Sequence, residues 1–158
     1  MNETVMKRAA IFALILGACI GIISLIPSVI GFGLFILICL SAPIVIIYMK
    51  KNEKHLSFLN TEQGAILGGI IGFCATVGFF ASFSPLVCII KLINKNYYAY
   101  MIPDMLSTAL WLFFVIAFAV ALTFAATNAV SAMSLAWVYS HIENAPDEDN
   151  RLDIKIED

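Results

Sequence analysis

Three long stretches without a charged residue limit what this chain of 158 residues can fold into. No Asp, Glu, Lys or Arg occurs in residues 9–49, 63–90 or 105–139. A helix needs about 20 apolar residues to cross a hydrocarbon core about 30 Å thick. Of all residues, 61% are hydrophobic and 13% are charged, whereas soluble domains are about 45–50% apolar and about 25% charged. The sequence therefore predicts an all-α membrane protein.

The first charge-free stretch is long enough for two membrane spans. As a single helix, residues 9–49 would extend about 60 Å, twice the thickness of the hydrocarbon core. Pro27 lies near the middle of this stretch, and proline removes a backbone donor and clashes with the preceding turn. We therefore favour two spans, over about 9–26 and 30–49, joined as a tight hairpin, over the alternative of one long helix.

The start of the chain also resembles a signal sequence. Lys7 and Arg8 precede a short apolar run, and "LGAC" at 16–19 resembles a lipoprotein cleavage box that would make Cys19 a lipid attachment point. However, the glycine two residues before Cys19 is unusual in such a box, and the chain stays apolar as far as Ile26. We expect residues 9–26 to be an uncleaved first span.

The other two charge-free stretches predict a second hairpin, with spans at about 64–90 and 105–139. The last of these is longer than a crossing needs, so this helix either tilts or projects into the cytoplasm. Trp111 and Trp137 are about 39 Å apart along a helix, close to the distance between the two membrane interfaces where tryptophans gather. The predicted fold is thus four transmembrane helices, arranged as two helical hairpins in a compact bundle within residues 9–142.

Lysine and arginine are distributed unevenly over the two sides that this layout creates. One side would hold both termini and the loop between the second and third spans, with seven basic residues: Lys7, Arg8, Lys50, Lys51, Lys54, Arg151 and Lys155. The other side would hold only Lys91 and Lys95. Because cytoplasmic loops carry the excess of lysine and arginine, we expect residues 1–8 and the C-terminus to be cytoplasmic. The expected location is a bacterial inner membrane.

The C-terminal segment, residues 143–158, differs in kind from the rest of the chain. It carries seven acidic and two basic residues, a net charge of −5. This composition is typical of a short disordered acidic tail. An alternative interpretation rests on "RLDIKIED", which alternates apolar and charged residues like a strand. Such a peptide would add to the sheet edge of a cytoplasmic partner.

Small residues recur at four-residue spacing on three of the predicted spans. Residues four apart share one face of a helix, and small residues there let two backbones approach closely in a membrane. We predict that these faces pack the helices together, within the chain or between two copies. The residues are Gly17 and Gly21 on the first span, Gly64, Gly68 and Gly72 on the third, and Ala117, Ala121, Ala125 and Ala129 on the fourth.

A group of polar residues on the fourth span has two interpretations. Thr123, Thr127, Asn128 and Ser131 lie close together on this helix, and Asn128 is the most polar side chain deep in any span. In one interpretation these side chains form hydrogen bonds between helices. In the other they line a polar path for water or a small solute.

The sequence lacks the side chains that intramembrane catalysis or metal binding requires. Ionisable residues within a membrane are rare and functional, and no predicted span contains one. We therefore predict no catalytic residue, no metal site, no cofactor and no binding of nucleic acid. The leading prediction is a non-enzymatic membrane protein that acts by helix association, as a structural or accessory subunit or as a homo-oligomer. The alternative is a small permease or channel subunit whose polar path follows the fourth span.

Overall fold

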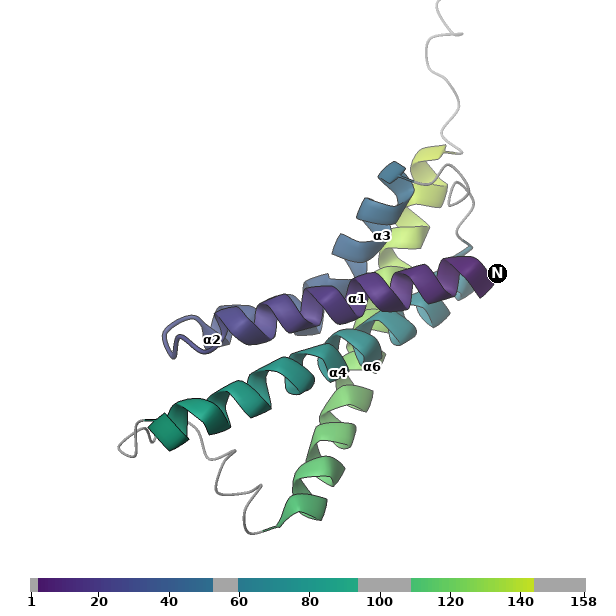
Figure 1. The fold of residues 1–158 in the computed structure, drawn as a ribbon. Helices are drawn as coiled ribbons and strands as arrows, with labels where there is room; N and C mark the ends of the chain where they lie inside the picture. The colour runs from purple at the N-terminus through teal and green to yellow at the C-terminus, as the bar shows by residue number, and fades with distance from the viewer. Residues whose placement is uncertain (1–2, 53–59, 94–108, 144–158) are drawn as a thin grey trace, which may run out of the picture.

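The computed structural model of the protein describes residues 3–52, 60–93 and 109–143, and every regular element within them is a helix. These elements are α1 (Glu3–Ile23), α2 (Ile30–Phe35), the π-helical η1 (Ile36–Leu40), α3 (Ser41–Asn52), α4 (Thr61–Ile93) and α6 (Leu110–Glu143) (Figure 1). The prediction of an all-α fold is confirmed for these residues. Of the predicted acidic tail, all but Glu143 lies outside the described residues.

Four helical segments are long and apolar enough to cross a membrane. They are Glu3–Ile23, Ile30–Lys51, Thr61–Ile93 and Leu110–Ile142. The sequence prediction of a multi-pass membrane protein with four spans agrees with these segments. The helices extend beyond some of the predicted span ends, because polar residues also support helix there.

Local chemistry explains where two of the helices begin. In the first turn of α1, Lys7 pairs with Glu3 at 2.7 Å, a favourable spacing of four residues on a helix. In α4, the N–H of Gly64 donates to the carbonyl of Asn60 at 2.8 Å. Asparagine is a favoured residue immediately before a helix. Both helices therefore start on polar residues outside the charge-free stretches.

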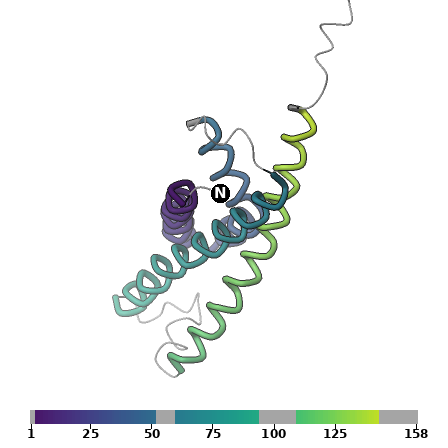
Figure 2. Tube along the Cα trace, turned by 90° about the vertical axis from the view of Figure 1, so that its right-hand side faces the viewer, coloured from purple at the N-terminus to yellow at the C-terminus, as the bar shows by residue number. Residues whose placement is uncertain are grey.

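Helix α4 lies at the centre of the molecule. Its extensive contacts are with α1 on one side and with α6 on the other, and the two views of the fold agree on this order (Figures 1 and 2). Helix α6 crosses α4 obliquely and diverges from it toward the start of α6 (Figure 1). One glycine-rich helix therefore supplies both main contacts of the fold.

The second predicted span is not a continuous α-helix. Its middle, η1, is π-helical, and α3 leaves this segment in a different direction from α2 (Figure 1). Pro43 lies three residues after the end of η1, and its ring nitrogen has no hydrogen to donate to the carbonyl of Cys39. The break is therefore centred a few residues before the proline.

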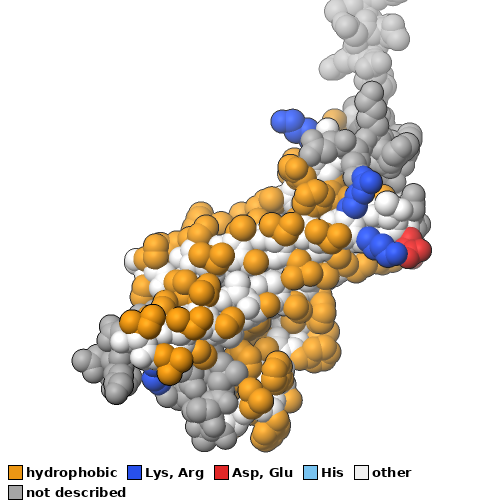
Figure 3. Space-filling view, viewed as in Figure 1, with side chains coloured by type: hydrophobic (Ala, Val, Ile, Leu, Met, Phe, Trp, Pro, Cys, Tyr) orange, Lys and Arg blue, Asp and Glu red, His pale blue; other side chains and the backbone are white. Residues whose placement is uncertain are grey.

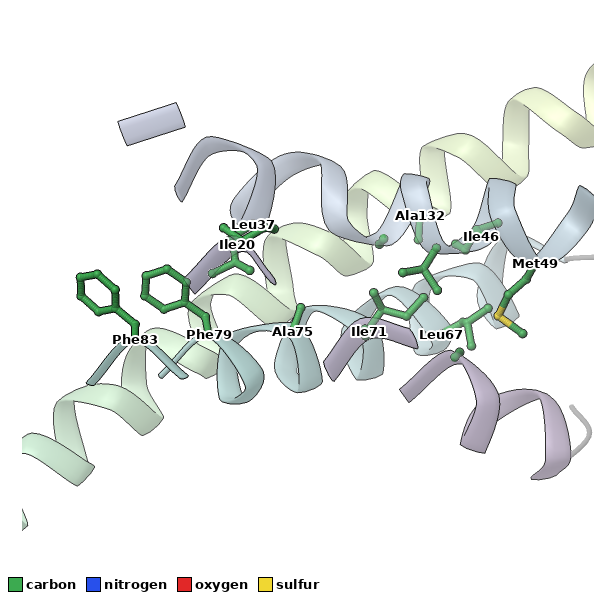
Figure 4. Packing of buried hydrophobic residues seen from close by; sticks show 14 of the residues in the cluster. Ile20, Leu37, Ile46, Met49, Leu67, Ile71, Ala75, Phe79, Phe83 and Ala132 are labelled. Carbon is green, nitrogen blue, oxygen red and sulfur yellow. The ribbon is translucent and has the colours of Figure 1, made fainter. Parts of the chain in front are cut away.

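The buried core follows one face of α4. Leu67, Ile71, Ala75, Phe79 and Phe83 are each at most 3% exposed, and side chains from α1, η1, α3 and α6 pack against this row (Figure 4). The rings of Phe79 and Phe83 stack with their centroids 5.0 Å apart. By contrast, only 11% of the residues in an apolar 18-residue stretch of α6 are buried, against 39% in the corresponding stretch of α4.

Charged side chains gather at the ends of the molecule. The start of α1 and the ends of α3 and α6 lie toward one end in Figure 1, and Lys7, Arg8, Lys50 and Lys51 belong to these segments. Lys91 lies near the opposite end of α4. On the face shown in Figure 3, many hydrophobic side chains lie between the two ends. This distribution matches a protein whose middle lies in lipid.

Candidate functional site

The contact between α4 and α6 depends on two glycines. A Cβ atom built on Gly68 would overlap the carbonyl oxygen of Asn128, and one built on Gly72 would lie 2.7 Å from the carbonyl oxygen of Phe124 and 3.0 Å from the Cα of Ala125. Side chains do not tolerate such distances to backbone atoms. The two predicted packing residues therefore lie where the backbones of α4 and α6 meet.

The contact between α1 and α4 has the same character. A Cβ on Gly17 would overlap the carbonyl oxygen of Ala75, and one on Gly21 would lie 2.9 Å from the carbonyl oxygen of Phe79. On the α4 side, a Cβ on Gly78 would overlap the carbonyl of Leu14. Gly78 was not among the packing residues predicted from the sequence. Its signal was the row of small residues Cys74, Gly78 and Ser82, which has the same four-residue spacing.

The four alanines of α6 that were predicted to pack against other helices lie in two different environments. Ala125 and Ala129 lie against Gly72 and Gly68 of α4. Ala117 and Ala121 instead line a groove between the diverging halves of α4 and α6. The remaining predicted packing residue, Gly64, is buried in the first turns of α4. The structure thus brings together two of the four predicted alanines of α6 and two of the three predicted glycines of α4.

Asn128 lies at the break in the second span. Its side chain is fully buried at 0% exposure. The amide nitrogen Nδ2 donates to the carbonyls of Leu37 and Ile38, both at 3.0 Å. The oxygen Oδ1 accepts from the Ser41 hydroxyl at 2.8 Å and from the backbone N–H of Ala42 at 3.0 Å. We call this set of groups the polar node.

The polar node adds hydrogen bonds to backbone groups at the π-helical break. The carbonyls of Leu37 and Ile38 also accept hydrogen bonds from the hydroxyls of Ser41 and Thr127. An unsatisfied backbone group costs several kcal/mol in the hydrocarbon region of a membrane. The Asn128 side chain therefore both donates hydrogen bonds to groups at the break and accepts them from groups there. Hydrogen bonding between helices was one of the two interpretations of Asn128 that the sequence allowed, but the sequence did not identify the partners, because a π-helical segment has no sequence signature of its own.

The other three residues of the predicted polar group, Thr123, Thr127 and Ser131, lie outside the centre of the node. The Thr127 hydroxyl reaches the carbonyl of Ile38 at 3.2 Å and that of Phe124 at 3.0 Å. The hydroxyl of Thr123 donates to the carbonyl of Ala119 at 3.0 Å, and that of Ser131 donates to the carbonyl of Thr127 at 3.1 Å. Thr123 and Thr127 are exposed and Asn128 is buried, so the four residues do not share one environment.

The groove between α4 and α6 is the other notable feature of this helix pair. Its volume is about 450 Å³, and it is lined by Phe73, Val77, Phe80, Ala81, Phe113, Phe114, Ala117, Phe118 and Ala121. Phe80 and Phe113 face each other across it edge to face, with ring centroids 6.0 Å apart. Phe73 and Phe118 make a similar pair at 6.1 Å. We call this space the apolar groove.

Side chains that could bind a metal ion are dispersed over the described parts of the chain. Over residues 3–52, 60–93 and 109–143, no group of three or more His, Cys, Asp or Glu side chains lies close enough together to hold a metal ion. Cys19, Cys39, Cys74 and Cys88 are free thiols.

Comparison of the chain with protein-family models, with curated proteins and with solved structures finds no match.

Proposed function

We propose that this protein is a non-enzymatic, multi-pass protein of the bacterial inner membrane that acts by binding another membrane helix. The observation that carries the proposal is the exposure of α6. Only 11% of the residues in its apolar 18-residue stretch are buried, against 39% in α4. The mean hydropathy of α6 is nevertheless higher, at 2.3 against 2.0. A membrane helix with so little internal packing is available to a partner subunit or to a second copy of the chain.

The open side of α6 has the composition of a helix–helix interface. Its exposed residues include Ala119, Thr123, Ala126, Thr127, Val130 and Ser134, and we call this set the α6 face. Interfaces between membrane helices are enriched in small and hydroxyl-bearing residues. The Ser134 hydroxyl donates to the carbonyl of Val130 at 2.9 Å, and that of Thr123 bonds within the helix in the same way. These internal bonds make the α6 face suitable for dry packing.

The charge distribution supports an orientation with both termini in the cytoplasm. Of the described residues, Lys7, Arg8, Lys50 and Lys51 fall toward the end that holds the N-terminus, and Lys91 falls toward the other end. Positive charge concentrates on the cytoplasmic side of membrane proteins. The acidic C-terminal segment would then extend into the cytoplasm, where we propose that it reaches a soluble partner.

A second candidate function, a small permease or channel subunit, draws support from the broken second span. Broken helices near the middle of the membrane often form binding sites in transporters. Against it, the polar node uses both Nδ2 and Oδ1 of Asn128 in bonds to the protein. A polar path along α6 would require water beside Thr123. A water-soluble thiol reagent should then modify a cysteine at Thr123 in a variant whose four native cysteines are replaced.

Co-purification of two differently tagged copies tests the leading proposal. We expect the two wild-type copies to co-purify, and Ala126→Trp to abolish this by placing a bulky ring on the α6 face. Ile15→Trp is the matched control, because Ile15 is 56% exposed on α1, away from α6. If both copies remain monomeric and crosslinking in native membranes finds no partner subunit, the proposal is wrong.

A further inference from the structure

We propose that the apolar groove binds one phospholipid of the membrane leaflet at the Lys91 end of α4. Its acyl chain would lie between α4 and α6, and its ester region would meet Ser84. This inference does not depend on the proposed association through α6, because the groove and the α6 face are formed by different residues.

The lining of the groove fits an acyl chain. All nine of its lining residues are apolar. Its volume of about 450 Å³ falls within the range of about 300–1,000 Å³ typical of small-molecule sites. Phe80 and Phe113 contact each other edge to face with ring centroids 6.0 Å apart, a normal distance for packed rings, so the two walls meet at this pair and leave no room for a helix about 10 Å wide. A flexible hydrocarbon chain fits this space better than a partner helix.

Ser84 lies one helical turn beyond the groove residue Phe80, on the same face of α4. It follows Val77 by seven residues on α4, and two turns of helix comprise about 7.2 residues, so the two side chains share one face. Ser84 is only 6% exposed, and within the described parts of the chain its Oγ atom has no hydrogen-bond partner. A buried hydroxyl without a partner is destabilising. An ester carbonyl of a bound lipid would accept the missing hydrogen bond.

Lys91 completes the match to a phospholipid. It follows Ser84 by another seven residues, so the same face of α4 carries a cation, then a hydroxyl, then the apolar groove. From Lys91 to Phe73 the helix rises about 27 Å. One leaflet with its headgroups is about 20–22 Å deep, which a tilted helix of this length spans. The lysine then lies at the depth of an anionic phosphate, with the chain end beside Phe73.

Photolabelling of the wild-type chain tests the location. The full-length protein is reconstituted into vesicles of phosphatidylethanolamine and phosphatidylglycerol that contain a phosphatidylglycerol with a photoreactive acyl chain. We expect labels to concentrate on the groove residues of α4 and α6. The exposed face of α1 provides the comparison, since Ile11 and Ile15 are 57% and 56% exposed. Labels spread evenly over all exposed faces would mean annular lipid only and would overturn the proposal.

Two variants test the proposed contacts by native mass spectrometry in detergent with added phosphatidylglycerol. Ala117→Phe fills the groove and should reduce the lipid-bound fraction about ten-fold. Val115→Phe is its control, because Val115 is 56% exposed on the same helix and does not line the groove. Ser84→Ala should reduce retention several-fold while leaving the fold intact. If Ser84→Ala and Ala117→Phe both retain lipid like the wild type, or if the groove crosslinks to a second copy instead, the proposal fails.

Discussion

The side chain of Asn128 accepts a hydrogen bond at 3.0 Å from the backbone N–H of Ala42, 86 residues earlier in the chain. This bond joins α6 to the point where the second span resumes α-helical geometry. The carbonyls of Leu37 and Ile38, which lie within η1, accept hydrogen bonds from the same side chain. One residue of α6 therefore bonds both to the π-helical segment and to the start of the α-helix that follows it, and this relationship leads to the first prediction.

Asn128→Leu should destabilise the protein by about 2–3 kcal/mol, because it removes the hydrogen bonds that this buried side chain makes at the break. The measurement is the free energy of unfolding in mixed micelles titrated with a denaturing detergent. Thr123→Val is the control, since the Thr123 hydroxyl is exposed and bonds only the carbonyl of Ala119 among the contacts described. Its effect should stay within about 0.5 kcal/mol. Equal effects of the two variants would show that the node does not stabilise the break.

Adjacent glycines of α4 should respond in opposite ways to one added methyl group. Gly68→Ala places a Cβ against the backbone of Asn128 and Ala129, whereas Gly69→Ala places it 3.9 Å from the nearest atoms of α6, an ordinary contact distance. We expect Gly68→Ala to cost about 1–3 kcal/mol through overpacking. Gly69→Ala should be neutral or stabilising by up to about 1 kcal/mol, because alanine favours helix over glycine. Similar unfolding free energies for both variants would mean that α4 and α6 do not meet at this face.

The α1–α4 contact allows a parallel test. Gly17→Ala would drive a methyl group into the carbonyl of Ala75, while a Cβ on Gly31 of α2 meets nothing within 4 Å. We expect Gly17→Ala to lower the thermal unfolding midpoint and Gly31→Ala to leave it unchanged or raise it. A loss of stability in Gly31→Ala, with Gly17→Ala unaffected, would contradict the packing of α1 on α4.

Ser82→Ala should have a small effect. The Ser82 hydroxyl lies 3.1 Å from the carbonyl of Ala18 on α1, but it is equally close to the carbonyls of Gly78 and Phe79 in its own helix. Hydrogen bonds between membrane helices contribute about 0.6 kcal/mol on average. We expect Ser82→Ala to cost about this amount in the same detergent titration, well below Gly17→Ala. A loss comparable to Gly17→Ala would mean that this hydroxyl, rather than close backbone packing, holds α1 on α4.

The sequence predicted the helical class and the four apolar segments because both depend on long-range composition. Charge-free stretches longer than about 20 residues leave few alternatives to spanning helices. The four-residue spacing also led to Gly17, Gly21, Gly68 and Gly72, since close backbone approach needs small residues in that pattern.

The pairing of the helices did not follow from the sequence. Gly68 and Gly72 contact α6, whereas Gly78, a turn and a half further along, contacts α1. A periodic pattern shows that one face of a helix carries small residues, but it does not show which other helix packs against that face. The same reason explains why Asn128 was recognised as polar and buried without its partners in η1 and α3. Those partners are backbone groups exposed by a break that only tertiary packing creates.

Photocrosslinking from the α6 face in native membranes tests the proposed function most directly. A benzophenone amino acid is placed at Val130, which is 65% exposed on α6, and at Ile11, which is 57% exposed on α1. We predict that Val130 gives a discrete adduct with a second copy or a membrane subunit, and that Ile11 gives none. If both positions yield only monomer, α6 faces lipid and the protein does not act by helix association.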